Sequence, residues 1–402
     1  MISLGRGVLR IRPKDIPSIV KLTFTFVPAR IYRWLHKDIW IITEYPENAR
    51  DNGYWLFKYV RENHPEKRAF YPIKKKASDY DKVKPLGNVI EFGGWKHYFL
   101  YWASHKFIGT TKYHGFPDER MCGGLFEVKF HRFKYIFLNH GFARGISNIV
   151  NTKDTNYDLI IAMSELEKKI IVEINNQPEE KVKAIGFCRH DNLDDGILDK
   201  KLIVVMPTWR RWLDYRHEED GQKINEIKRR YQESQYYKNY MALLNHPKLL
   251  SYLEEKDLKL IFYLHGYAQA YSKTFHSDSK RVVIAEKDKY FVQDLLKKAA
   301  FLVTDYSSVV FDFAYMKKPV VYFQFDAEKF AQNQYAESSY YQYQRDGFGP
   351  IVESVDEVVS SIEESQKNNF QMEKKYIERV NSFFQDFGKD HCEKTYKLID
   401  EL

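Results

Sequence analysis

The sequence predicts an α/β protein with two Rossmann-like domains, each built on a parallel sheet, that face each other across a cleft. The first reason is length, because 402 residues exceed what one hydrophobic core usually holds. The second is that short apolar runs alternate with helical patterns, as in parallel sheets with crossover helices. The third is a polar, glycine-punctuated segment, GFCRHDNLDDGILDK (186–200), which separates two such series and has the composition of a hinge.

The strand-like runs of each series end in polar or turn residues. The first series consists of IWIITE (39–44), AFYPI (69–73), NVIEF (88–92), KFIGT (106–110), YIFLNH (135–140) and LIIAMS (159–164), with a helical pattern at 53–63. The second consists of KLIVVMPTW (201–209), LKLIFYLHG (258–266), RVVIAE (281–286), AAFLVTDYSS (299–308) and KPVVYFQFD (318–326), with helical patterns at 238–256 and 290–299. Residues 210–238 form a charged insertion that we expect to be exposed.

These patterns divide the chain into four parts. Residues 1–37 are a basic amphipathic segment, 38–192 an N-terminal α/β domain and 193–375 a C-terminal α/β domain. Residues 376–402 form a C-terminal helix that could pack back on the N-terminal domain.

Charge is concentrated at the N-terminus, although the whole chain carries a formal +8. Residues 1–37 hold eight lysines and arginines against Asp15 alone, a net +7, so the rest is nearly neutral and a nucleic-acid partner is not predicted. The basic residues are Arg6, Arg10, Arg12, Lys14, Lys21, Arg30, Arg33 and Lys37. Three scattered cysteines, Cys122, Cys188 and Cys392, are typical of reduced thiols in a cytosolic protein and have no metal-binding spacing.

The basic segment also contains apolar and aromatic residues, in IPSIVKLTFTFVPARIYRWLHK (16–37). Its longest uncharged stretch, LTFTFVPA, is too short to span a bilayer, and it lacks the apolar core and cleavage site of a signal peptide. This composition favours contact with an anionic membrane surface. The alternative is a helix packed on its own domain, with its cations in solvent.

The turn DYSS joins a strand end to a helix start in FLVTDYSSVVFDFAYMKK (301–318). A serine there could simply cap the helix. The same free N–H groups, the hydroxyls of Ser307 and Ser308 and the positive end of the helix also make an anion site. With Thr304 and Asp305 at the strand end, a bound diphosphate is a second interpretation.

The stretch VTDYSSVVFDFAYMKKPVVYFQFD (303–326) resembles the CDP-glycerol glycerophosphotransferase family of teichoic-acid and capsule polymer synthesis. Further stretches agree in order, so the resemblance covers roughly residues 37–355. They are 37–65, YIFLNHGFARG (135–145), GFCRHDNL (186–193), VVMPTWRRWL (204–213), LIFYLHG (260–266), YFVQDLL (290–296) and RDGFGPIV (345–352).

This resemblance implies a GT-B-like fold, with the acceptor on the N-terminal domain and the CDP donor on the C-terminal domain. It implies transfer of glycerol phosphate or ribitol phosphate from CDP-glycerol or CDP-ribitol to a hydroxyl of a polyprenyl-diphosphate-linked acceptor, with release of CMP. We therefore expect a peripheral enzyme on the cytoplasmic face of the membrane. The alternatives are a GT-B nucleotide-sugar glycosyltransferase and an inactive membrane-associated scaffold of the same pathway.

Two histidines lie just after strand-like runs and match family motifs. By this analogy His140, in FLNHG, would be the general base for the acceptor hydroxyl. His265, in FYLHG, could donate to the phosphate or help CMP leave; the family often has proline next, where this chain has Gly266. Either could instead be a structural loop histidine.

The remaining candidates have polar side chains near the expected cleft. Arg210 could bind phosphate, although Arg211 and Arg216 are near. Gln293 and Asp294 could meet ribose or polyol hydroxyls, or complement a helix dipole. Arg189 and Asp191 could touch the nucleotide or form a plain interdomain salt bridge.

No resident metal and no cofactor beyond the CDP-polyol donor are predicted. The triplet Asp79-Tyr80-Asp81 is interpreted as a solvated loop. Ser307, Ser308, helix N–H groups and arginine could stabilise the phosphoryl charge without metal, while a divalent ion could arrive with the diphosphate.

Overall fold

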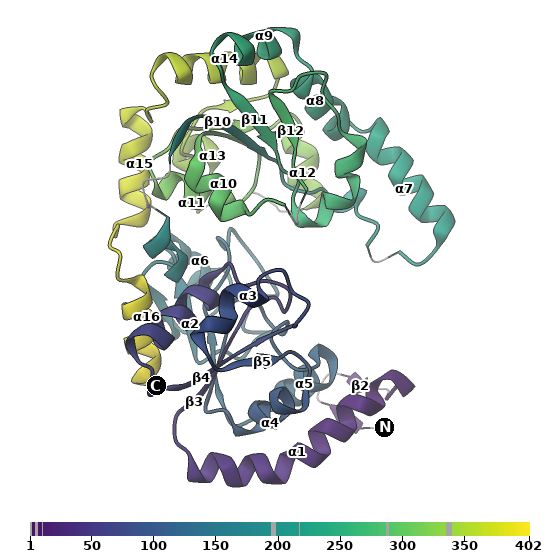
Figure 1. The fold of residues 1–402 in the computed structure, drawn as a ribbon, viewed down its shortest axis with the longest axis vertical. Coiled ribbons are helices and arrows are strands. Elements are labelled where there is room, and N and C mark those ends of the chain that lie inside the picture. The colour runs from purple at the N-terminus through teal and green to yellow at the C-terminus, as the bar shows by residue number, and fades with distance from the viewer. Residues whose placement is uncertain are drawn as a thin grey trace. The chain divides into compact units, whose positions relative to one another are not determined.

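Two parallel sheets divide the chain into two compact units (Figure 1). Unit 1 comprises residues 1–191 and 388–402, and unit 2 comprises residues 192–387. The structure, a computed structural model, describes every residue except 1, 5, 6, 10, 194–197, 217, 287–288 and 335–339. Arg6 and Arg10 of the basic segment, and part of the predicted hinge, therefore lie outside the described residues.

The sheet of unit 1 has seven parallel strands in the order β5-β4-β3-β6-β7-β8-β9. The strand bounds are β3 Ile39–Thr43, β4 Arg68–Ile73, β5 Val89–Glu91, β6 Lys106–Gly109, β7 Lys134–Phe137, β8 Leu159–Ala162 and β9 Val182–Ala184. The helices are α1 Ile16–Leu35, α2 Asn52–Asn63, α3 Tyr80–Val83, α4 Trp95–Ala103, α5 Glu119–Glu127, α6 Glu165–Glu173 and α16 His391–Asp400; β1 (Ile2–Leu4) and β2 (Gly7–Leu9) form a hairpin.

The sheet of unit 2 has six parallel strands in the order β12-β11-β10-β13-β14-β15. The strand bounds are β10 Asp199–Met206, β11 Lys259–Phe262, β12 Val282–Ile284, β13 Ala299–Thr304, β14 Val320–Phe323 and β15 Ile351–Val352. The helices are α7 Gly221–Glu233, α8 Gln235–Leu244, α9 Pro247–Glu255, α10 Val292–Lys298, α11 Val309–Tyr315, α12 Ala327–Asn333, α13 Tyr343–Asp346, α14 Val355–Lys367 and α15 Lys374–Phe384. The predicted α/β class with two Rossmann-like sheets is therefore confirmed.

The C-terminal segment divides between the units. Helix α15 stays in unit 2, whereas α16 returns to unit 1 and packs against α2 (Figure 1). The boundary between the two units falls after Asp191, and the sequence analysis placed it after residue 192.

Two local expectations for residues 210–256 need correction. The single helical pattern at 238–256 is two helices, α8 and α9, because Pro247 cannot continue a helix from the residues before it. The insertion is also less exposed than its charge suggests. Leu213, Tyr231 and Tyr236 from this segment are buried in the core of unit 2.

Each sheet has one position where the strand order reverses, between β3 and β6 in unit 1 and between β10 and β13 in unit 2. In open α/β sheets, ligands bind beyond the carboxyl ends of the strands at such a position. The strand ends are level there, because Thr43 pairs with Gly109 and Met206 pairs with Thr304. The loops after these strands and their neighbours are therefore where each unit can hold a ligand.

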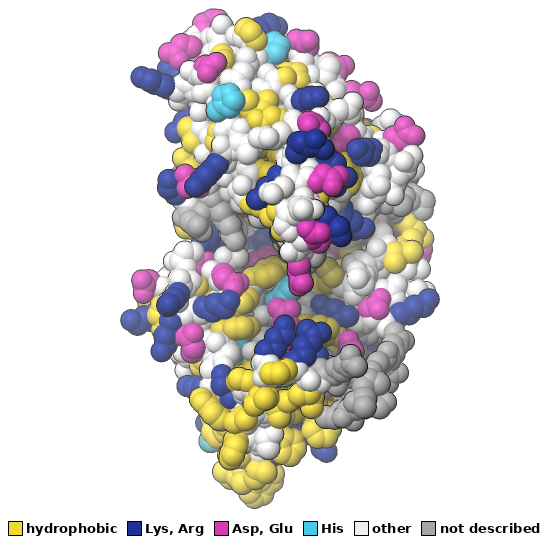
Figure 2. All heavy atoms as spheres, turned by 90° about the vertical axis from the view of Figure 1, so that its right-hand side faces the viewer, with side chains coloured by type: hydrophobic (Ala, Val, Ile, Leu, Met, Phe, Trp, Pro, Cys, Tyr) yellow, Lys and Arg dark blue, Asp and Glu magenta, His cyan; other side chains and the backbone are white. Residues whose placement is uncertain are grey.

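Helix α1 packs one face on α4 and leaves the other uncovered by the described residues. Leu22 and Ala29 are buried, and Trp102 Nε1 of α4 donates a hydrogen bond to the Leu22 carbonyl at 2.9 Å. Seven apolar residues along the opposite side are exposed, namely Ile16, Val20, Phe24, Val27, Ile31, Trp34 and Leu35. Figure 2 shows hydrophobic side chains gathered at this end of the molecule. None of the described helices is long and apolar enough to cross a membrane.

Candidate active site

A buried ion-pair cluster lies at the strand-order reversal of unit 2. Arg210, after β10, contacts Asp305, after β13, through Nη1 at 2.8 Å. Its Nε and Nη2 donate to the two carboxylate oxygens of Asp326, after β14, at 2.8 and 3.0 Å. The side chains of Arg210 and Asp305 have no exposed surface and that of Asp326 has 5%. The cluster thus ties together the ends of three adjacent strands.

Arg210 therefore points into unit 2 and not toward solvent. Its guanidinium also lies over the rings of Tyr236, Tyr306 and Phe330, at 4.9–5.3 Å from their centres. All the contacts described for it are structural, and they do not support the predicted role in binding phosphate. The nearby Arg216 is partly exposed, pairs with Asp214 and lies over the Tyr267 ring.

The loop that carries Ser307 and Ser308 is held by the same cluster. Asp305 Oδ1 accepts from the backbone N–H of Thr208 at 2.8 Å, while Gln324 donates to the Asp305 carbonyl at 3.0 Å. The hydroxyl of Thr304 is used inside the sheet, where it donates to the Met206 carbonyl at 2.7 Å. Both Asp305 and Thr304 thus help to hold the loop.

Ser307 and Ser308 are half-buried at the start of α11. Ser307 Oγ accepts a weak hydrogen bond from the Val309 N–H at 3.4 Å. Ser308 is the residue before the helix, but its hydroxyl caps no N–H group. The simple capping interpretation therefore does not account for Ser308.

His265 follows β11, the strand next to β10. Its Nδ1 accepts a hydrogen bond from the backbone N–H of Tyr267 at 3.2 Å. An acceptor nitrogen carries no proton, so in neutral His265 the proton is on Nε2. Neutral His265 is therefore a donor at Nε2.

The other two candidates of unit 2 lie on α10. Gln293 is half-buried and Asp294 is exposed in the first turn, where an acidic side chain favours the helix dipole. Nothing described in unit 2 places Asp294 against the serine loop.

His140 lies in unit 1, after β7, which neighbours β6. Its Nδ1 is 3.2 Å from the carbonyl oxygen of Thr110, just beyond β6. A carbonyl can only accept, so Nδ1 carries the proton and Nε2 keeps its lone pair. Although part of the side chain is exposed, burial of the ring lowers the pKa of His140, and the charge of Asp51 acts in the opposite direction.

Asn139 and Glu167 hold the backbone around His140. Asn139 adopts a left-handed conformation, with φ 59°, and its Oδ1 accepts from the His140 N–H at 2.8 Å. Buried Glu167 accepts from Asn139 Nδ2 at 3.0 Å and from the Ala143 N–H at 2.7 Å. Burial raises the pKa of Glu167 to about 7. The sequence offered a signal for Glu167 that was missed, since Ser164 to Glu167 has capping-box spacing.

Arg189 is a second support of the His140 loop. Its Nη1 donates to Asp51 Oδ1 at 2.8 Å and to the His140 carbonyl at 3.1 Å. Asn52 joins the same segments, because it donates to the Asn139 carbonyl and accepts from the Arg189 N–H. Both members of the Arg189–Asp51 ion pair are in unit 1, so this pair stabilises the unit from within.

Asp191 anchors the returning C-terminal helix. Its carboxylate accepts from the backbone N–H groups of His391 and Cys392 at 2.9 and 2.8 Å. These N–H groups belong to the first turn of α16, where an acidic side chain is favourable. Asp191 therefore has a structural partner within unit 1.

Asp79 corrects the expectation of a solvated loop at residues 79–81. It is 4% exposed, accepts from the Ala49 N–H at 2.9 Å and pairs with Arg50. Asp79 thus fixes the loop between β3 and α2.

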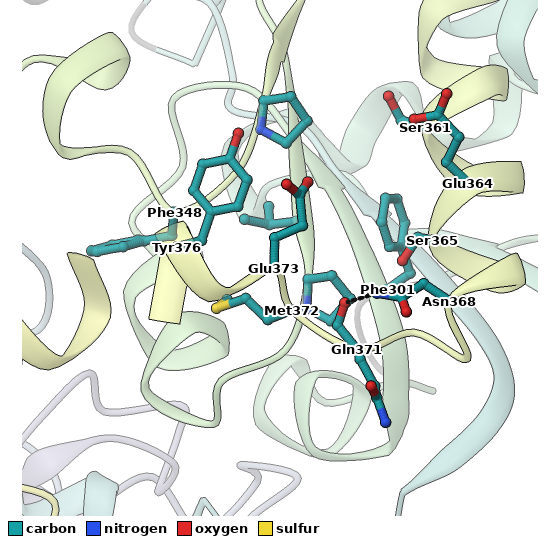
Figure 3. A pocket seen from close by; sticks show the side chains of 13 residues that line it. Phe301, Phe348, Ser361, Glu364, Ser365, Asn368, Gln371, Met372, Glu373 and Tyr376 are labelled. Carbon is teal, nitrogen blue, oxygen red and sulfur yellow. Dashed lines mark hydrogen bonds between the residues drawn. The ribbon is translucent and has the colours of Figure 1, made fainter. Parts of the chain in front are cut away.

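One cavity of unit 2 lies away from these loops. It has a volume of about 360 Å³ and is lined by Phe301, Val320, Phe348, Met372 and Tyr376 (Figure 3). Phe301 and Val320 are near the amino ends of β13 and β14, opposite the edge that carries Ser307. The cavity contains none of the predicted site residues.

Comparison with known proteins assigns the family. Residues 28–400 match the family described as CDP-glycerol:poly(glycerophosphate) glycerophosphotransferase. The chain belongs to this family.

Members of the glycerophosphotransferase family with known roles are similar to this chain over different lengths. The minor teichoic acid biosynthesis protein GgaB of Bacillus subtilis (strain 168) is 30% identical over 91% of this chain, which spans 40% of GgaB. A teichoic acid poly(glycerol phosphate) polymerase of Bacillus spizizenii is 25% identical over 82% of this chain and 67% of its own length. A teichoic acid ribitol-phosphate primase of the same organism is 24% identical over 64% of this chain and 62% of its own length.

Solved structures show the same fold at low identity. The wall teichoic acid polymerase TagF superposes with a TM-score of 0.65 at 17% identity and covers 98% of both chains. A putative UDP-N-acetylglucosamine 2-epimerase from Listeria monocytogenes gives a TM-score of 0.55 at 10% identity, over 90% of this chain and 96% of its own. The predicted GT-B-like architecture of two Rossmann-like domains agrees with these similarities.

The ion-pair cluster of unit 2 leads to a prediction about stability. Arg210→Met leaves two buried carboxylates without their cation, so we expect the free energy of unfolding to fall by about 3–5 kcal/mol. Chemical denaturation would measure the loss. Arg229→Met, on the exposed side of α7, is the matched control and should change it by less than about 0.5 kcal/mol. An Arg210 variant as stable as the control would contradict this role.

Proposed function

We propose that this protein transfers a polyol phosphate from a CDP-polyol to a hydroxyl of a polyprenyl-diphosphate-linked acceptor and releases CMP. Membership of the glycerophosphotransferase family supports this type of reaction. One relative is named for glycerol phosphate and another for ribitol phosphate, so both polyols are candidates. Teichoic acid synthesis is the process in which those relatives are named, and we propose the same setting here.

The observation that carries the proposal is the opposite proton placement on two histidines. His140 has its proton on Nδ1 and a free lone pair on Nε2, which suits a general base. Neutral His265 has its proton on Nε2, which suits a donor to phosphate oxygen. A base for the attacking hydroxyl and a donor to the phosphate oxygens both favour phosphoryl transfer.

In the proposed reaction, His140 Nε2 removes the proton of the acceptor hydroxyl as its oxygen attacks the phosphorus that bears the polyol. The new O–P bond forms while the bond from that phosphorus to the CMP oxygen breaks. His265 donates a hydrogen bond to the departing phosphate, and the hydroxyls of Ser307 and Ser308 hold the diphosphate oxygens. These roles require no resident metal, although a divalent ion could accompany the diphosphate.

We also propose that the enzyme works at the cytoplasmic face of the membrane, attached through α1. Its seven exposed apolar residues lie within roughly 100° of arc at 100° per residue, so they form one continuous stripe. Trp34 is 82% exposed and Phe24 is 71% exposed, which is costly in water and favourable at a bilayer interface. A polyprenyl-linked acceptor would be reached from that surface.

The central test measures CMP release with a lipid acceptor analogue, with CDP-glycerol and CDP-ribitol supplied separately. We expect release from one donor, and a fall of roughly a hundred- to ten-thousand-fold in His140→Ala because the general base is lost. His276→Ala, an exposed histidine of unit 2, is the control. A parallel assay with EDTA asks whether a divalent ion is needed. No release from either donor, with an acceptor that a known relative uses, would refute the proposal and point to nucleotide sugars.

The pKa of His140 leads to a prediction about pH. The base must be neutral, and burial lowers its pKa below the usual value of 6.5. Activity should therefore persist as the pH falls through 6.5 and decline only at lower pH. A profile of kcat/KM against pH would show this acidic limb. A limb at or above 6.5 would contradict His140 as the free base.

The apolar stripe leads to a prediction about membrane binding. Phe24→Gln with Trp34→Gln should lower partitioning onto lipid vesicles by at least roughly tenfold, because two aromatic side chains no longer enter the interface. Sedimentation with vesicles would measure it. Leu198→Gln removes an exposed apolar side chain of unit 2 and should have no effect. Equal vesicle binding by the Phe24/Trp34 variant and the Leu198 variant would contradict membrane attachment through α1.

A further inference from the structure

Three arginines converge where the second half of α1 meets the segment before β7. Arg33 Nη2 donates to the backbone carbonyl of Arg132 at 2.8 Å. Arg30 is three residues before Arg33 and thus on a neighbouring part of the helix surface. Arg132 is not part of the basic N-terminal segment, so this grouping depends on tertiary packing and is not visible in the sequence.

No carboxylate described in the structure forms an ion pair with these three arginines. Burial lowers the pKa of Arg33 to about 10, and the charges of Arg30 and Arg132 act in the same direction. Burial, and then Arg132, also lowers the pKa of Arg30. Such mutual repulsion disfavours the folded state, and a bound anion would relieve it.

The three arginine side chains differ in how far their guanidinium groups are available to bind an anion. Arg33 Nη1 donates to the carbonyls of Ala103 and Ser104, at the C-terminal end of α4, which is a favourable place for a cation. Its guanidinium is therefore largely occupied. Arg30 is half-exposed and Arg132 is exposed, so these two can contact an anion.

Arg30 borders the apolar stripe of α1. Arg30 lies roughly 40° around the helix from the edge of the stripe. Its guanidinium is 5.3 Å from the ring centre of Phe26, which stacks on Phe130 at 6.1 Å. Phe130 is itself 53% exposed. Cations beside exposed apolar side chains match the order of a bilayer, with phosphates above acyl chains.

We propose that Arg30 and Arg132, positioned by Arg33, form a binding site for the phosphate groups of anionic phospholipids. Guanidinium forks fit phosphate oxygens, and the stripe enters the acyl region beside them. The inference rests on the proposed membrane attachment but not on the proposed chemistry. It assigns one end of α1 to headgroup recognition.

The test is sedimentation with vesicles of phosphatidylcholine alone, or of phosphatidylcholine with phosphatidylglycerol. Arg30→Gln with Arg132→Gln should weaken binding to the anionic vesicles by roughly 5-fold for each cation, and leave binding to neutral vesicles unchanged. Arg229→Gln with Arg230→Gln on α7 removes the same charge from exposed positions and should have no effect. Thermal unfolding should show the first variant to be at least as stable as wild type, because repulsion is relieved.

A second variant separates recognition of the phosphate group by the guanidinium from electrostatic attraction to the anionic surface. Arg30→Lys with Arg132→Lys keeps the charge but loses the fork, so we expect binding between that of wild type and the glutamine variant. Equal loss in the α7 control, or full binding by either altered cluster, would overturn the inference. CMP release with a water-soluble acceptor should not change in the cluster variants. If wild type releases no CMP but binds anionic vesicles through Arg30 and Arg132, the proposed chemistry fails and the lipid site stands.

Discussion

The ion pairs of Arg210 with Asp305 and Asp326 are the constraint on which the candidate donor half depends. Burying three charges is expensive, and the cost is recovered only when the geometry is good and the remaining oxygens are hydrogen-bonded. Asp305 Oδ1 accepts from the Thr208 N–H, whereas Oδ2 is held by Arg210 as an ion pair at 2.8 Å and has no hydrogen-bond partner among the described residues. Since the three residues follow β10, β13 and β14, their pairing fixes the relative positions of three loops. Ser307 and Ser308 follow Asp305 in one of these loops, so their positions are fixed as well.

In unit 1, the position of the loop after β7 is fixed by hydrogen bonds from side chains to the backbone. The peptide groups of Asn139, His140 and Ala143 are held by Asn52, Arg189 and Glu167 respectively. Each support comes from a different element, so the loop after β7 cannot move without breaking several of them. A base must keep its position to be effective, and this arrangement supplies the required rigidity without touching the lone pair of His140.

The sequence indicated the strands well because buried parallel strands are continuous apolar runs, whereas short β9 and β15 offered too few residues to recognise. It also placed His140, His265, Ser307 and Ser308 at strand ends. It could not give the direction of Arg210. An arginine after a strand has the same appearance whether it faces phosphate or buried acids, and its partner Asp326 lies far along the chain. The grouping of Arg30 with Arg132 depends on tertiary packing in the same way.

Backbone groups set the proton positions of both histidines, and the replacement of the family's frequent proline by Gly266 does not change this. The donor to His265 Nδ1 is the N–H of residue 267, so the side chain at position 266 takes no part in the hydrogen bond. A Cβ atom at Gly266 would have no heavy atom within 4 Å, and its φ is not in the left-handed range. The loop therefore does not need glycine, and a chain with another residue there could present the same histidine. Because a peptide N–H and a carbonyl do not titrate, they favour the same neutral tautomers of His140 and His265 at every pH.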